Sequence, residues 1–326
     1  MKYRQLGRTG ARLSVIGLGS YLTIGDHLDD VTARDTIRRA YDLGVNFFDT
    51  ANAYNRGGAE QTLGRYLKDF RRDSIFLATK VWAPMGGGPN DRGLSAKHIY
   101  EQCHASLRRL QTEYVDLYQC HRPDGNTPLE ETVRAMEDLA RAGKILYWGT
   151  SEWPAWMIAE ANGIARTIGA RPAVSNQPRY NLLYRLPEAE LFQHARMCGI
   201  GQVVFSPLAH GILTGKYTPG QPPPPGTRAA DDTQNMVIKN LYWKDEYLQR
   251  AQEMKKLADE LGITCAQLAL AWILRRPEVT SAIIGASKVS QVEENCKATE
   301  VEVPQEVLAR LDAIFPGPAE SYPIQY

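Results

Sequence analysis

Short apolar segments alternate with helical segments along almost the whole chain, and this alternation restricts the fold more than any other feature. Eight segments read as buried strands, near residues 15, 46, 75, 115, 145, 174, 203 and 282, and at least one helical pattern follows each of them. Eight such units favour a closed parallel barrel over an open sheet, because closure leaves no strand edge unpaired. The sequence therefore predicts an α/β fold, a single eight-stranded (β/α) TIM barrel over residues 1–326.

Two stretches lie outside this simple alternation. Residues 3–6 and 12–14 flank Gly7-Arg8-Thr9-Gly10 and read as a hairpin, which we expect to plug the bottom of the barrel. Residues 206–244 are irregular and include a Pro-rich run at 221–226. Because that run lies inside the alternation, it is a long loop at the C-terminal face of the barrel and no linker between domains.

Composition excludes several classes of function. Lys plus Arg number 38 and Asp plus Glu 37, so no basic excess indicates a nucleic acid or an anionic membrane as partner. No apolar run reaches the length of a membrane span and the N-terminus lacks an apolar signal core, so we expect a cytoplasmic protein without membrane insertion. The five cysteines are scattered without a Cys-x-x-Cys, and His98 and His104 are six apart, so neither a disulfide framework nor a metal site is expected.

Ionisable side chains stand where the strands near 46, 75 and 115 end. Asp49 ends the first of these strands, Tyr54 follows five residues later, Lys80 ends the second, and His121 follows the third. In barrels of this type, chemistry lies at the C-terminal ends of the strands. Each residue alone also has a structural explanation, such as a capping aspartate or an ion-paired lysine. Together they indicate a site that holds and moves a proton.

These four residues match, in order and strand position, the catalytic tetrad of the aldo-keto reductases, which the chain resembles over nearly its whole length. His121 stands where channel subunits of animals can carry Asn, and this favours a working reductase. The chain is most similar to the potassium-channel β-subunit-like branch of the family, through residues 92–99, 110–116, 122–128 and 147–151.

The resemblance implies reduction of a small carbonyl compound with NADPH. Tyr54 would protonate the carbonyl oxygen, and the Lys80 ammonium would lower the pKa of the phenol from about 10 toward the working pH. Asp49 would keep Lys80 charged and in place. A neutral His121 would donate a hydrogen bond that orients the carbonyl.

The cofactor is expected in the loops after the last two strands, where barrels often bind phosphate. A Rossmann fingerprint is missing, because residues 17–22 lack its third glycine. Residues 206–216 resemble the pyrophosphate loop of the family. Residues 285–288 place backbone N–H groups at a helix start, which suits an anion. The structural alternative there is a helix capped by a box of Ser290 and Glu293.

By resemblance, Ser151 and Gln177 hold the nicotinamide amide, and the ring stacks on either Phe205 or Tyr180. Lys216 and Arg228 are expected to select the 2′-phosphate, and three residues on one helix face meet the adenosine end. The expected NADPH/NADP+ contacts are Ser20, Tyr21, Ser151, Gln177, Phe205, Ser206, Pro207, Leu208, Ala209, Gly211, Leu213, Lys216, Arg228, Gly285, Ser287, Gln291, Glu294 and Asn295.

Two other functions stay open at this point. One is a channel-type regulatory subunit that binds the cofactor with little turnover. The other is a barrel with different chemistry, such as an aldolase that uses Lys80 as a Schiff base. The substrate itself is not specified, although Tyr21, Trp82, Trp153 and residues 316–326 are expected to shape its pocket. A homo-oligomer is compatible with the resemblance.

Overall fold

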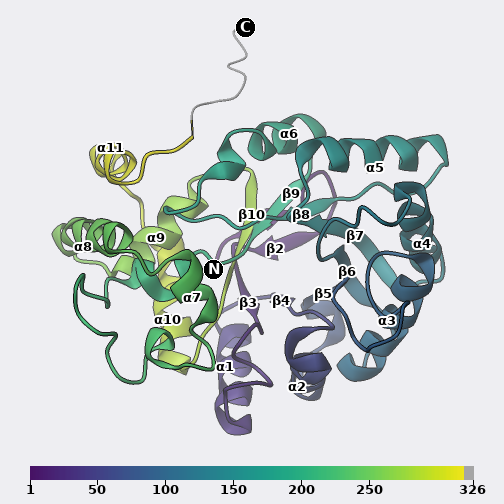
Figure 1. Cartoon of the computed structure of the whole chain (residues 1–326), viewed down its shortest axis with the longest axis horizontal. Helices are drawn as coiled ribbons and strands as arrows, with labels where there is room; N and C mark the ends of the chain where they lie inside the picture. The colour runs from purple at the N-terminus through teal and green to yellow at the C-terminus, as the bar shows by residue number, and fades with distance from the viewer. Residues whose placement is uncertain (319–326) are drawn as a thin grey trace, which may run out of the picture.

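A computed structural model describes residues 1–318 and contains the predicted closed barrel of eight parallel strands. The strands follow one another around the barrel in chain order, and the last pairs with the first (Figure 1). The barrel strands are β3 (Ile16–Gly19), β4 (Phe47–Asp49), β5 (Phe76–Val81), β6 (Val115–Cys120), β7 (Ile145–Ser151), β8 (Ser175–Gln177), β9 (Gly201–Val204) and β10 (Val279–Ile284).

Helices surround the strands (Figure 1). The helix α3 shows why these segments fold as they do: Ser95 caps its first turn, and Ile99, Cys103, Leu107 and Leu110 form one buried face at spacings of three and four. The α-helices are α1 (Asp30–Asp42), α2 (Gly58–Leu67), α3 (Ala96–Leu110), α4 (Leu129–Arg141), α5 (Ala155–Thr167), α6 (Leu191–Cys198), α7 (Met236–Leu241), α8 (Asp245–Glu260), α9 (Cys265–Leu274), α10 (Val289–Lys297) and α11 (Gln305–Ile314). Within residues 1–318, no single helix is long and apolar enough to cross a membrane.

The predicted N-terminal hairpin is present as β1 (Tyr3–Gln5) and β2 (Arg12–Ser14). Leu6 and Leu13, in and beside the hairpin, are fully buried and share a cluster with Phe47, Phe76 and Val203 of the barrel strands. Full burial of a leucine side chain contributes about 2 kcal/mol. The hairpin therefore closes one end of the barrel with apolar side chains, and the opposite end remains for polar ones.

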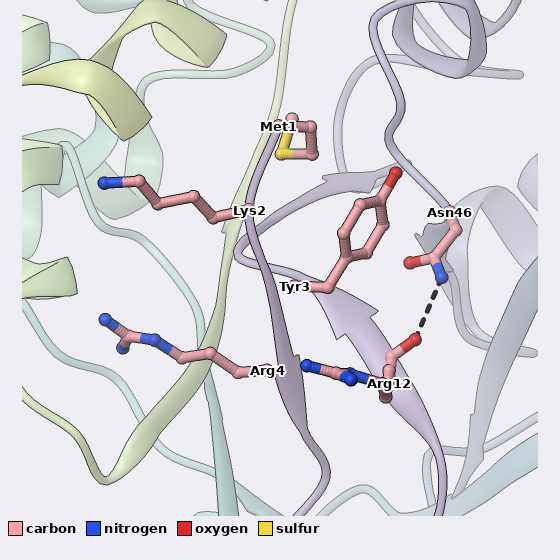
Figure 2. Close-up of a pocket in the computed structure, with 6 residues that line it drawn as sticks. All are labelled: Met1, Lys2, Tyr3, Arg4, Arg12 and Asn46. Atoms are coloured by element: carbon pink, nitrogen blue, oxygen red, sulfur yellow. Dashed lines mark hydrogen bonds between the residues drawn. The ribbon is translucent and has the colours of Figure 1, made fainter.

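A groove lies beside this hairpin, and Figure 2 shows the residues that line it. Asn46 donates a hydrogen bond to the Arg12 carbonyl oxygen at 2.9 Å, and the Tyr3 hydroxyl donates to the Gly44 carbonyl oxygen at 2.8 Å. Asn46 directly precedes β4, so the groove belongs to the N-terminal end of the strands. It is thus separate from the strand ends that carry Asp49 and Lys80.

The barrel interior is narrow near this closed end. A side chain on Gly17 of β3 would place its Cβ 2.5 Å from the ring of Phe47, so only glycine fits there. Along β4 and β5 the inward positions alternate with outward ones, as the pleat of a strand requires. Phe47 and Phe76 therefore point into the apolar end, and Asp49 and Lys80, at even spacing from them, point into the same interior nearer its mouth.

Two local predictions differ from the structure. The helix α7 forms inside residues 206–244, which were expected to be irregular. The capping box of Ser290 and Glu293 is wrong, because α10 already begins at Val289 and Ser290 lies within its first turn. The Glu293 carboxylate instead accepts a hydrogen bond from Arg39 at 2.7 Å.

Candidate active site

The ammonium group of Lys80 lies at the centre of the polar cluster at the barrel mouth. Its side chain is 0% exposed, and Nζ donates to Asp49 Oδ1 at 2.5 Å, to the Thr50 carbonyl oxygen at 2.7 Å and to the Tyr54 hydroxyl at 3.3 Å. An ammonium has three donors, and here all three have partners. Asp49 from β4, Lys80 from β5 and Tyr54 from the following turn are thus fixed relative to one another.

The charge state of Lys80 follows from this geometry. Burial lowers the pKa of Lys80, but the attraction of Asp49 and Tyr54 outweighs it, and the net pKa lies above its ordinary value. Lys80 is therefore an ammonium ion at neutral pH. Schiff-base chemistry requires a neutral amine as nucleophile, so this arrangement disfavours the aldolase alternative.

The expected lowering of the Tyr54 pKa is wrong in direction. Burial raises the pKa of Tyr54 and outweighs the opposing effect of Lys80. Asp49, 2.5 Å from the ammonium, adds to this rise in the pKa of Tyr54, because it compensates the charge of Lys80 and itself disfavours a phenolate. Tyr54 is therefore protonated at neutral pH and has a hydrogen to donate.

His121 follows β6 and lies beside Tyr54, with the two ring centroids 5.7 Å apart. Burial, then the charges of Lys80 and Arg122, hold the pKa of His121 well below its ordinary value. The imidazole is therefore neutral. Its Nδ1 is buried without a hydrogen-bond partner among residues 1–318. Adjacent Cys120 is fully buried in the outer core and not in the barrel interior, as the strand alternation predicts.

Two glutamines hold the second oxygen of Asp49, and the sequence analysis missed one of them. Gln177 donates to Asp49 Oδ2 at 2.9 Å and Gln119 donates to the same oxygen at 3.3 Å. Both side chains are buried. Gln119 could have been predicted to point into the barrel, because it lies two residues after Leu117 on the same strand and therefore on the same face. The side-chain amide of Gln177 was expected to contact the nicotinamide. Its nitrogen instead donates to Asp49.

Several side chains that were expected to contact the cofactor already have hydrogen-bond partners inside the protein. The Ser151 hydroxyl donates to the Gln177 carbonyl oxygen at 2.9 Å, and the Ser20 hydroxyl donates to Thr50 Oγ1 at 2.8 Å. The Tyr21 ring is 42% exposed, with its centroid 5.0 Å from that of Tyr54, so it covers the mouth. Trp153 was expected to shape the substrate pocket, but it is only 1% exposed and does not line an open pocket rim. Residues 319–326 of the expected tail lie outside the described residues.

The structure separates the two aromatic candidates for stacking. Tyr180 is fully buried, stacks on Trp272 with centroids 5.2 Å apart, and donates its hydroxyl to Glu188 at 2.5 Å. Phe205 directly follows β9 and is only partly buried. Of the two rings, Phe205 is therefore the one that reaches the barrel mouth.

The loop after β9 has an unusual backbone conformation. Ser206, Ala209 and His210 have left-handed φ angles of 53°, 47° and 56°, a conformation that costs non-glycine residues about 1–3 kcal/mol each. The side chains of Pro207, Ala209 and Leu213 are buried, and Leu208 is partly buried. Gly211 also has positive φ, and Lys216 Nζ would lie 3.4 Å from a Cβ at that glycine. The backbone of this loop, more than its side chains, is available to a ligand.

Lys216 and Arg228 are close in space in this region. Partial burial and then the charge of Arg228 lower the pKa of Lys216. Arg228 contacts His210, at 3.3 Å between Nη1 and Nδ1. Within residues 1–318, neither cation forms an ion pair with a carboxylate. Two neighbouring cations without an acidic partner fit a phosphate group.

The loop after β10 adjoins this region, because β10 pairs with β9 on one side and β3 on the other. A Cβ on Gly285 would meet only Thr23, at 3.8 Å, so the backbone is accessible there. The Ser287 N–H and hydroxyl both donate to Gln291 Oε1, at 2.7 and 3.3 Å. On α10, Glu294 is partly buried and Asn295 is buried. The residues expected to meet pyrophosphate, 2′-phosphate and adenosine therefore lie along two neighbouring strand ends.

A (β/α)8 barrel with a buried Asp–Lys–Tyr cluster and a cationic loop at the same end of the strands defines a class of barrel oxidoreductases. Consistent with this, the model of the Aldo/keto reductase family matches residues 15–315. The chain belongs to the aldo/keto reductase family, whose members are oxidoreductases that generally use a nicotinamide cofactor.

Curated relatives match nearly the whole chain. A "Probable voltage-gated potassium channel subunit beta" from Arabidopsis thaliana is 43% identical over 92% of each chain. The protein of the same description from Oryza sativa subsp. japonica is 42% identical over 99% of this chain and 100% of its own. A "Putative voltage-gated potassium channel subunit beta" from Schizosaccharomyces pombe is 40% identical over 96% of this chain and 93% of its own. The resemblance identified in the sequence is thereby confirmed.

Proposed function

We propose that the protein reduces aldehydes or ketones to alcohols with NADPH. The observation that carries this proposal is the set of three hydrogen bonds from Lys80 to Asp49, Thr50 and Tyr54. It holds a protonated phenol at the barrel mouth and a cation beside it. Such an arrangement can donate one proton to a substrate and stabilise the anion that remains.

The proposed proton donor is the Tyr54 hydroxyl, which protonates the carbonyl oxygen as the alcohol forms. Its raised pKa keeps it protonated at neutral pH. The nearby ammonium of Lys80 stabilises the tyrosinate that is left. Neutral His121 donates a ring N–H to the carbonyl oxygen and so orients it toward Tyr54.

NADPH, when bound, supplies the hydride. Lys216 and Arg228 would hold its 2′-phosphate, and Phe205 would lie against its nicotinamide ring. The Gln177 amide oxygen and Ser151 would meet the carboxamide. The loop backbone of residues 206–213, together with Gly285 and the start of α10, would hold the remaining polar groups of the cofactor.

A second candidate function is a channel-type regulatory subunit with little turnover. The descriptions of the relatives from Arabidopsis, Oryza and Schizosaccharomyces favour it. A neutral imidazole beside the proton donor favours reduction, since regulation alone does not require that pairing.

Turnover of a panel of simple aldehydes and ketones tests the two functions. We expect oxidation of NADPH that depends on the carbonyl compound, and a larger loss of turnover than of NADPH affinity in His121→Asn. Absence of turnover with every compound, at saturating NADPH, would favour the regulatory function. Borohydride trapping should give no adduct at Lys80.

A further inference from the structure

We propose that the preferred carbonyl substrates carry a carboxylate and that Arg122 binds it. This inference rests on the proposed reduction and specifies its substrate class. It concerns a residue to which the site described above gives no function.

Arg122 is held beside the proposed carbonyl site. Its Nη1 donates to the His121 carbonyl oxygen at 2.6 Å and lies 3.4 Å from Ser151 Oγ. The side chain is partly buried, so its guanidinium is anchored but reaches solvent. A guanidinium has five N–H donors, and these two contacts leave most of them free.

The charge of Arg122 has no carboxylate partner among residues 1–318. Two other partly buried arginines of the protein do have one: Arg72 pairs with Asp116 at 2.7 Å, and Arg109 pairs with Glu60 at 2.6 Å. A partly desolvated cation without a counter-ion favours an anionic ligand, and the planar guanidinium matches a carboxylate with two parallel hydrogen bonds.

The cofactor phosphates are expected elsewhere on the barrel mouth. Arg122 follows β6, which lies opposite β10 in the closed strand order, whereas Lys216 and Ser287 follow β9 and β10. Arg122 is instead next to His121 in the chain, and its charge contributes to the low pKa of that imidazole. A carboxylate on Arg122 would therefore belong to the molecule whose carbonyl group faces His121.

A matched pair of aldehydes tests this proposal: 4-carboxybenzaldehyde and its neutral methyl ester, methyl 4-formylbenzoate. We expect the wild type to prefer the acid, mainly through KM. In Arg122→Met this preference should fall by roughly 10- to 100-fold, because one charged hydrogen-bonding partner is lost, while turnover of the ester stays near wild type. Arg122→Lys should retain part of the preference. The control Arg92→Met, at an exposed arginine, should leave it unchanged.

Each alternative result has a definite meaning. If the acid-to-ester ratio is the same in wild type and Arg122→Met, the inference is wrong, while ester turnover still supports the proposed reduction. If Arg122→Met weakens both aldehydes and NADPH binding equally, Arg122 serves the cofactor or the fold, and the inference is again wrong. If neither aldehyde is reduced, the proposed reduction fails. Calorimetric titration of acid and ester into the NADP+-loaded wild type and Arg122→Met then decides the matter: tighter binding of the acid that the variant loses supports the carboxylate site, and equal binding overturns it.

Discussion

The cluster of Asp49, Lys80 and Tyr54 and the loop region of Lys216 and Arg228 both contain cations, but they differ in how these charges are balanced. Lys80 gives all three of its hydrogen bonds to groups of the protein. Lys216 and Arg228 have no carboxylate partner within residues 1–318. The first region has all its hydrogen-bond partners within the protein, and we propose that an anionic ligand supplies the partner of the second. Substitutions in the Asp49–Lys80–Tyr54 cluster should therefore affect chemistry and stability, and substitutions of Lys216 or Arg228 should affect ligand binding.

The two regions also differ in backbone conformation. Asp49 and Lys80 lie on strands whose hydrogen bonds to their neighbours fix them. Ser206, Ala209 and His210 lie in a loop with left-handed φ angles, which cost free energy without a ligand that uses them. The predictions below separate the two regions experimentally.

The largest effect is expected from Tyr54→Phe. Removal of the hydroxyl takes away the proposed proton donor, and general acids contribute about 10²- to 10⁴-fold to turnover. The ring remains to pack under Tyr21, so quenching of protein fluorescence by NADPH should be nearly unchanged. Turnover close to wild type would remove Tyr54 from the mechanism.

Lys80→Met and Lys216→Met form a matched pair that compares the regions directly. In Lys80→Met, Asp49 loses its buried ion partner, and such losses cost about 3–5 kcal/mol of stability. Gln119 and Gln177 still donate to Asp49 Oδ2, which favours the lower end of that range. Lys216→Met removes a cation without a partner, so the free energy of unfolding should barely change. Urea denaturation measures both, and equal losses would contradict the comparison.

Arg228→Ala should weaken NADPH binding by about 1.5–3 kcal/mol, or roughly one to two decades, because a charged partner of the 2′-phosphate is lost. NADH lacks that phosphate, so its affinity should stay nearly constant. The measurement is the ratio of the two dissociation constants in wild type and variant. Equal weakening of both cofactors would mean that Arg228 holds the pyrophosphate or the loop.

The smallest effect is expected from Gln119→Leu, which removes one donor from Asp49 Oδ2. A single hydrogen bond of this kind contributes about 1 kcal/mol, so turnover should fall no more than roughly tenfold. Reduction requires protonated Tyr54 and should be lost only as pH rises through its raised pKa, above the ordinary value near 10. A less compensated Asp49 disfavours the phenolate further, so the variant should lose activity at higher pH than wild type. The control is Gln202→Leu, another buried glutamine, which should leave the pH profile unchanged.

The order of strands and helices, and the barrel that they form, could be predicted from the sequence alone. Hydrophobic periodicity is a local property, and the eight strands with their helices follow from it directly. The sequence also predicted that Asp49, Tyr54, Lys80 and His121 lie at or just after strand ends. Parallel strands in a barrel bring all such ends to one mouth. The matching family pattern then indicated the class of chemistry.

Which side chains contact one another, and how their charges are balanced, became known only from the folded structure. Gln177 reaches Asp49 across 128 residues of sequence, and no local pattern predicts that hydrogen bond. The pKa of Tyr54 rises because burial outweighs a cation that Asp49 already compensates. Tyr180 is buried against Trp272, and for this reason we propose Phe205 as the ring that lies against the nicotinamide. Desolvation and Coulomb energies depend on distances between distant segments, and folding alone fixes those distances.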